Sequence, residues 1–122
     1  MYDHVGLHVQ DLEASVRFYQ AALAPLGHVL CMSDANSAGF GPKDAPSLWL
    51  YHDAIANMPV GAHVAFRAEQ RSHVDKFHTE GLRAGGQDLG KPGVREDYAP
   101  NYYAAFLTDP DGNNIEAVCM TQ

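Results

Sequence analysis

The sequence has 122 residues, which is enough for one domain with a hydrophobic core and too few for two conventional domains. Its net charge of −7 and its eight Lys and Arg residues argue against nucleic-acid binding, which needs a clustered basic surface. No stretch approaches the ~20 apolar residues of a membrane span, and no secretory leader pattern is present, so we expect a cytoplasmic protein. Two cysteines, Cys31 and Cys119, are too few for a disulfide framework and fit a reducing compartment.

The first predicted element is a strand over residues 4–9, where apolar and other residues alternate with the period of a half-buried strand. Asp11 is a typical N-cap for the helix that follows, and apolar residues recur at helical spacing up to a terminating glycine at Gly27. Three short strands are predicted next, near residues 28–32, 38–40 and 48–51.

The second half of the chain repeats this order. Five pairs of residues lie 59 positions apart without a gap: His4 and His63, Val5 and Val64, Phe18 and Phe77, Leu23 and Leu82, Gly27 and Gly86. Strands are predicted near residues 87–90, 102–108 and 114–120, the last two joined by the tight turn Asp-Pro-Asp-Gly at 109–112. The sequence therefore predicts an α+β fold of two tandem βαβββ modules, about 1–57 and 58–122, in a single domain.

Three residues of types that bind metals fall on the strand faces expected to point away from the helices. They are His4, His63 and Glu116, and the repeat places the two histidines at equivalent positions, where a pseudo-twofold axis would bring them together. Two imidazoles and a carboxylate suit a divalent metal such as Fe, Mn, Ni, Co or Zn. The competing interpretation is that seven histidines place some side chains inward by chance, and that Glu116 is a surface carboxylate near a turn.

Three segments together resemble the vicinal oxygen chelate superfamily, which includes glyoxalase I, extradiol dioxygenases, fosfomycin-resistance thiol transferases and bleomycin-binding proteins. They are HVGLHVQDL at 4–12, the helix with Phe18 and Tyr19, and FLTDPDGNNIE at 106–116. The resemblance implies a curved mixed sheet around a concave site, metal ligands at His4, His63 and Glu116, a catalytic role for Glu116, and a homodimer.

One position departs from the pattern of glyoxalase I, which has a further carboxylate-type ligand on the last strand of its first module. Trp49 stands at the corresponding place here and cannot bind a metal. Since lactoylglutathione chemistry needs a base as well as a Lewis acid, the classical glyoxalase I activity is in doubt.

The Gly- and Pro-rich stretch at 86–102 is longer than a hairpin needs and is predicted to cover the site as a lid. The candidate substrate contacts are Trp49, Arg67, Arg95, Tyr98 and Tyr103, with the arginines suited to a carboxylate or phosphate. Against this, loop arginines are usually solvated and aromatic residues in strands usually belong to the core.

Three functions remain open from the sequence. The favoured one is a metal-dependent enzyme, of lyase, isomerase or dioxygenase type, that acts on a small oxygen-bearing molecule. The second is a metal-free small-molecule binding protein of the bleomycin-resistance type, and the third is an interaction module that has kept the fold without the pocket.

Overall fold

The computed structural model describes residues 1–53 and 61–121, and the predicted module boundary near residues 57 and 58 lies outside them. The first module contains β1 (Val5–Val9), α1 (Leu12–Leu23), the short 3₁₀ helix η1 (Ala24–Leu26), β2 (Val29–Ser33), β3 (Ser37–Gly41) and β4 (Leu48–His52). Asp11 caps α1 as predicted, and its carboxylate accepts a hydrogen bond from the backbone of Ala14 at 3.0 Å.

The second module repeats the order with β5 (His63–Arg67), α2 (Arg71–Arg83), β6 (Gln87–Val94), β7 (Tyr103–Thr108) and β8 (Asn114–Cys119). Each module forms its own four-stranded mixed sheet, ordered β1-β4-β3-β2 and β5-β8-β7-β6, in which the first strand is parallel to the last. The predicted fold of two tandem βαβββ modules is therefore confirmed, including the hairpin of β7 and β8.

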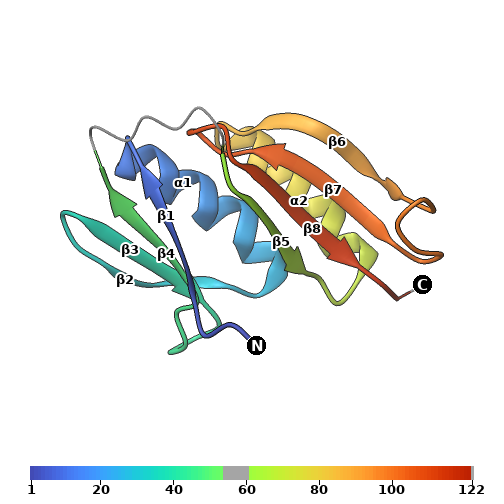
Figure 1. Ribbon diagram of the computed structural model, residues 1–122, viewed down its shortest axis with the longest axis horizontal. Helices are drawn as coiled ribbons and strands as arrows, with labels where there is room; N and C mark the ends of the chain where they lie inside the picture. The colour runs from blue at the N-terminus through green and yellow to red at the C-terminus, as the bar shows by residue number, and fades with distance from the viewer. Residues whose placement is uncertain (54–60, 122) are drawn as a thin grey trace.

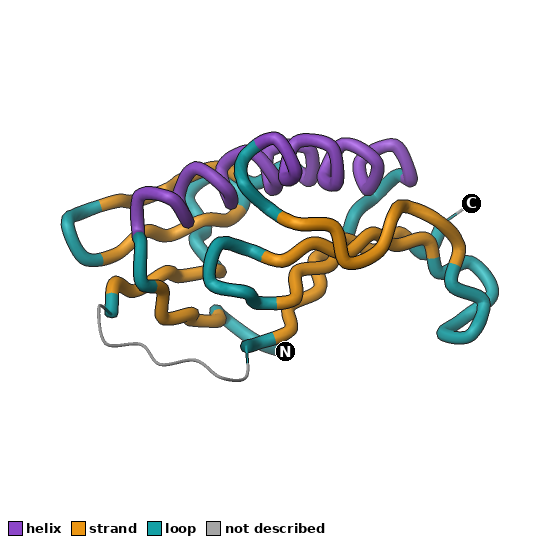
Figure 2. Tube along the Cα trace, turned by 90° about the horizontal axis from the view of Figure 1, so that it is seen from above, coloured by secondary structure: helices purple, strands orange, loops and turns teal. Residues whose placement is uncertain are grey.

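The two helices lie side by side on one side of the strands, and within residues 1–53 and 61–121 no helix covers the opposite face of either sheet, which we call the open face (Figures 1 and 2). Alternate residues of β1, β4 and β8, such as Leu7, Leu50 and Ile115, are buried beneath the helices in one hydrophobic core that spans both modules. The residues between them point to the open face, which is where the sequence places the candidate site.

A buried carboxylate joins the two modules. The hydroxyl of Tyr19 in α1 donates to Asp109 at 2.6 Å, and the amide of Asn113 donates to the same Oδ2 atom at 2.7 Å. The other oxygen of Asp109 accepts from the backbone N–H groups of Asp111 and Asn113, and Asn113 in turn accepts from Ala62. The predicted turn is thus also a joint that fixes the second module against α1.

The predicted lid is shorter than the sequence suggests. Residues 87–94 form β6, which pairs along its length with β7, so only residues 95–102 form the connection. Register shifts after Asp88 and after Gly90 let the strand accommodate Pro92, which has no N–H to donate. The prediction of a long lid is wrong because β-bulges allow a Gly- and Pro-rich segment to remain in the sheet.

Candidate functional site

Glu116 is a buried carboxylate on the open face of the second sheet. Its neighbours Ile115 and Ala117 are completely buried under α2, so the side chain of Glu116 points the other way. It is nevertheless only 2% exposed. A carboxylate in such a place needs polar partners, because an unpaired buried charge is costly.

Three side chains surround Glu116. The Nε2 atom of His63 lies 3.0 Å from Oε1, and the hydroxyl of Tyr102 donates a hydrogen bond to Oε2. Phe106, directly opposite Glu116 on β7, stacks on the ring of His63 with centroids 6.4 Å apart. His63 comes from β5 and Tyr102 from the end of the connection before β7, so residues far apart in the sequence meet here.

Each ring nitrogen of His63 faces an oxygen atom. Its Nδ1 atom lies 3.1 Å from the backbone carbonyl of Asn114, which can only accept a hydrogen bond. A neutral imidazole has one N–H, so when Nδ1 donates to that carbonyl, the lone pair of Nε2 faces the carboxylate of Glu116. Metal-binding histidines are commonly held in this way, with one nitrogen on a carbonyl and the other on the metal.

These two residues fit a divalent metal as neighbouring ligands. In an octahedral site, ligands bound at about 2.1 Å and at right angles lie about 3 Å apart, which matches the distance between Nε2 of His63 and Oε1 of Glu116. The side-chain oxygen of Asn114, on the same face of β8, is buried without a hydrogen-bond partner. A bound ion or ligand would provide a partner for groups that the protein leaves facing one another.

His4 is not part of this arrangement. It precedes β1, half of its side chain is exposed, and its Nδ1 atom lies 2.7 Å from Asp3. β1 and β5 run in opposite directions, so the starts of the two strands do not lie side by side (Figure 1). Within residues 1–53 and 61–121, no three His, Cys, Asp or Glu side chains are grouped to hold a metal ion. The structure therefore brings together His63 and Glu116 but not His4.

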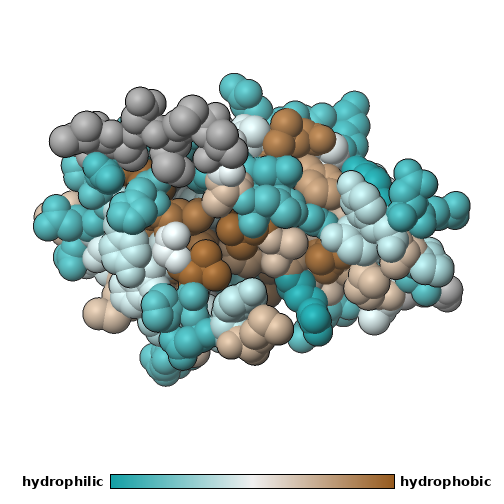
Figure 3. Space-filling model, viewed as in Figure 1, coloured by the Kyte–Doolittle hydropathy of each residue, from teal (hydrophilic) through white to brown (hydrophobic). Residues whose placement is uncertain are grey.

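His4 instead borders a cavity of about 330 Å³ between the modules, where Phe40, Leu48 and Phe66 supply apolar walls. Figure 3 shows hydrophobic side chains in the middle of this face, with hydrophilic ones around them. His28 also lines the cavity, and burial lowers its pKa, which favours a neutral ring.

Trp49 occupies the position in the first module that Glu116 occupies in the second. In the parallel strand pairs, Trp49 lies opposite Gly6 and Glu116 lies opposite Ala65, and Gly6 and Ala65 are themselves repeat partners. Trp49 stacks on Tyr51 with their planes 15° apart. The open face of the first module thus carries aromatic rings where the second carries a carboxylate.

The other predicted substrate contacts fall into two groups. Arg95 lies over the ring of Phe106, and Tyr98 packs edge-on against Tyr102, so both adjoin the surroundings of Glu116. Arg67 is exposed at the end of β5 on the face that carries His63.

Tyr103 lies on the opposite face. Its hydroxyl donates to Asp75 of α2 at 2.5 Å, and the guanidinium of Arg71 lies 4.9 Å from the centre of its ring. The hydrogen bond to Asp75 raises the pKa of Tyr103. These contacts attach β7 to α2 and leave Tyr103 outside the site.

The sequence analysis missed Tyr102 and Phe106. Burial, followed by the hydrogen bond to Glu116, raises the pKa of Tyr102 to about 12, so its hydroxyl remains a donor at neutral pH. The alternation of β7 contained the signal for Phe106, because Ala105 and Leu107 face the core. Nothing in the sequence indicated that Tyr102 reaches Glu116.

Comparison with known proteins agrees with this arrangement. The family model described as Glyoxalase/Bleomycin resistance protein/Dioxygenase superfamily matches residues 2–117. The chain belongs to this superfamily. The comparison with curated proteins gave no match.

Solved structures of the superfamily superpose over nearly the whole chain. A glyoxalase/bleomycin resistance protein from Albidiferax ferrireducens is 31% identical, with 98% of each chain covered and a TM-score of 0.83. A glyoxalase/dioxygenase from Nostoc punctiforme is 22% identical, with 100% of this chain and 92% of that chain covered and a TM-score of 0.72. A family enzyme from Burkholderia phytofirmans is 18% identical, with 98% of each covered and a TM-score of 0.74. The last two support the fold alone.

The superfamily contains enzymes, and this agrees with a site on the open face. None of the helices within the described residues is long and apolar enough to cross a membrane.

Proposed function

We propose that the protein is a glyoxalase-like, divalent-metal-dependent enzyme of lyase, isomerase or dioxygenase type that acts on a small oxygen-bearing molecule. The observation that carries the proposal is the His63–Glu116 pair, whose 3.0 Å separation and histidine orientation suit two ligands of one metal ion. The proposed metal is Fe, Mn, Ni, Co or Zn, since imidazole and carboxylate together serve all of these. We expect the enzyme in the cytoplasm.

Each residue has a proposed role. A bound metal would supply Lewis-acid polarisation of the substrate oxygens. Glu116 would hold the metal together with His63, and it is the proposed catalytic carboxylate, able to take up a proton released from the substrate. Tyr102 holds Oε2, which keeps Oε1 directed at His63. Phe106 forms an apolar wall beside His63, and Trp49 is a proposed wall from the other module.

His4, the third proposed ligand, would have to come from a second copy of the chain. Within one chain its imidazole lies at Asp3, just before the start of β1, and is not grouped with His63 and Glu116. The proposed homodimer would bring β1 of one copy to the open face of β5 and β8 in the other. In this arrangement each site contains His63 and Glu116 from one subunit and His4 from its partner.

Metal analysis of purified protein tests the proposal. Wild-type protein, depleted of metal and reloaded with Zn²⁺ or Mn²⁺, is expected to hold near-stoichiometric metal, while His63→Ala and Glu116→Ala lose it. His52→Ala is the matched control, because it removes an exposed imidazole from the end of β4. Equal metal content in all four proteins would refute the proposed ligands.

A mixing experiment tests the role of His4 in the dimer. His4→Ala and His63→Ala are each expected to bind metal poorly, whereas a refolded mixture of the two regains part of the binding. The reason is that a mixed dimer contains one site with both histidines. A mixture that binds no more metal than the separate variants would contradict a site shared between copies.

The second candidate is a metal-free small-molecule binding protein of the bleomycin-resistance type. It is favoured by the absence of a three-ligand group within the described residues, and by the net charge of −7, which would attract a cationic ligand. Stoichiometric metal that is lost on mutation of His63 would exclude it.

A further inference from the structure

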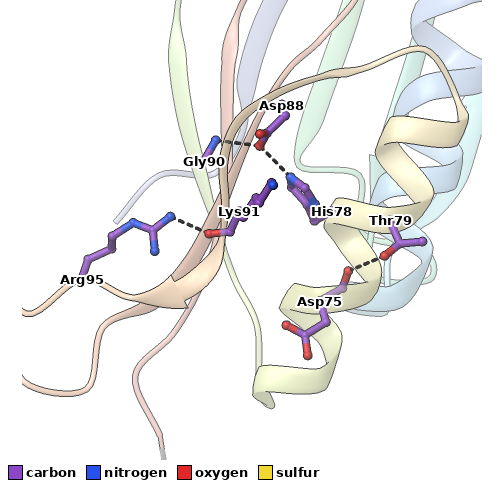
Figure 4. Close-up of polar contacts among 7 residues, drawn as sticks. All are labelled: Asp75, His78, Thr79, Asp88, Gly90, Lys91 and Arg95. Carbon is purple, nitrogen blue, oxygen red and sulfur yellow. Dashed lines mark hydrogen bonds and ion pairs between the residues drawn. The ribbon is translucent and has the colours of Figure 1, made fainter.

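Arg95 is a fixed cation beside the proposed site. Its guanidinium donates to the carbonyl of Lys91 at 2.6 Å and lies 5.5 Å from the centre of the Phe106 ring. Figure 4 shows the side chain of Arg95 on the side of β6 that faces away from α2. His78 of α2 and Asp88 form a separate pair on the other side of β6. Arg95 is therefore held on the open face of the sheet, the face that carries Glu116.

Two glycines leave the space that the guanidinium fills. A Cβ atom at Gly90 would lie 3.1 Å from Nη2 of Arg95, and one at Gly93 would lie 3.0 Å from Nη1. Both distances are tighter than ordinary carbon contacts, so larger residues at these positions would push the guanidinium away. The Gly-Lys-Pro-Gly segment of β6 (residues 90–93) thus leaves room for the guanidinium of Arg95 to pack against the strand.

This cation has no carboxylate partner in the described part of the chain. Its contacts are a neutral carbonyl and an aromatic ring, and the nearby Glu96 and Asp97 form no ion pair with it. Arginines that are fixed in place are usually paired, and this chain has 15 acidic residues against eight basic ones. A guanidinium held without an acid retains free N–H groups that suit an incoming anion.

We propose that the substrate carries an anionic group, a carboxylate or a phosphoryl group, which binds to Arg95 while its oxygen atoms meet the metal at His63 and Glu116. Phe106 connects the two ends, since its ring centre lies 5.5 Å from the guanidinium carbon and 6.4 Å from the centre of the His63 ring. The guanidinium carbon of Arg95 therefore lies no farther from the centre of the His63 ring than the sum of these two distances. A small molecule can span such a separation. This inference rests on the proposed function only for the part of the ligand that would meet the metal.

Calorimetric titration with matched chelators tests the proposal. Zn²⁺-loaded protein is titrated with neutral catechol, with 3,4-dihydroxybenzoate and with 3,4-dihydroxyphenylphosphonate, which share the same two adjacent oxygens. Wild-type protein is expected to bind at least one of the anions about ten- to hundred-fold more tightly than catechol, the range for a charge-assisted hydrogen bond. The two anions together distinguish a carboxylate from a phosphoryl preference.

Two variants and a control locate the effect. Arg95→Met is expected to abolish the preference without weakening catechol, and Gly90→Ala is expected to reduce it by displacing the guanidinium. Arg83→Met removes an exposed arginine of α2 and is expected to leave the preference unchanged. A wild-type protein that binds metal and all three chelators equally would overturn the inference and leave the metal site standing.

If the protein binds no metal, benzoate and benzyl alcohol are compared on the metal-free protein. Tighter binding of benzoate that depends on Arg95 would support the anion site although the metal proposal has failed. Equal or absent binding of both would overturn it.

Discussion

The joint between the modules allows a direct test with Tyr19→Phe. Tyr19 is completely buried, and its hydroxyl is one of two donors to Oδ2 of Asp109. Removing it leaves the carboxylate with Asn113 and two backbone N–H groups as donors. Hydrogen bonds to charged groups contribute about 1.5–3 kcal/mol, so we expect a loss of about this size in the free energy of unfolding. At roughly 4 °C per kcal/mol for a chain of this length, the melting temperature should fall by about 6–12 °C.

The assay is urea unfolding followed by circular dichroism, with thermal unfolding as a second measure. Tyr2→Phe is the matched control, because it removes the same atom from a side chain that is 81% exposed and should change stability by less than about 0.5 kcal/mol. A loss below about 0.5 kcal/mol for Tyr19→Phe would show that the Tyr19–Asp109 hydrogen bond does not stabilise the pairing of the modules.

Three further predictions follow from single contacts. Tyr102→Phe should weaken Zn²⁺ binding about ten- to hundred-fold in calorimetry while Tyr98→Phe does not, because Tyr102, of these two tyrosines, donates to Glu116. The hydrogen bond from His78 lowers the pKa of Asp88 from 3.8, so its stabilising contribution is complete above that pH and is lost as pH falls through the lowered value. Urea midpoints of Asp88→Asn should therefore fall less steeply than those of wild type below pH 4, and parallel curves would contradict this. Gly86→Ala should cost at least about 1–3 kcal/mol in urea unfolding, since its Cβ would lie 2.5 Å from Phe18 and 2.9 Å from a backbone carbonyl, and an unchanged midpoint would disprove the clash.

The fold was accessible from the sequence because its determinants are local and repeated. Alternation marks the strands, Asp11 marks the start of α1, and the 59-residue offset links the two modules. The offset fails in one detail: Gly27 and Gly85, not Gly86, adopt positive φ at the ends of the helical segments. Gly86 instead has no room for a side chain, so the aligned glycines serve different purposes.

The candidate site was accessible only in part, because its assembly depends on long-range packing. The face of Glu116 follows from alternation, but its burial depends on His63 and Tyr102, which arrive from different elements. His4 has the same place in the repeat as His63, yet opposite strand directions separate them within a chain. Sequence periodicity predicts the face on which a residue lies but not which residues of two modules meet.

The two modules share one backbone pattern but differ in the side chains on their open faces. Trp49 and Glu116 hold equivalent places in their sheets, and each determines what its open face can do. A Cβ at Gly39 would lie 2.8 Å from Trp49, so the indole ring of Trp49 fits only because residue 39 has no side chain. In the second module, the guanidinium of Arg95 lies close to Gly90, and His63, Tyr102 and Glu116 lie on the same open face. Under the proposed function, we expect a polar, oxygen-bearing group of the ligand to bind the second module, and a flat or apolar part to contact the first.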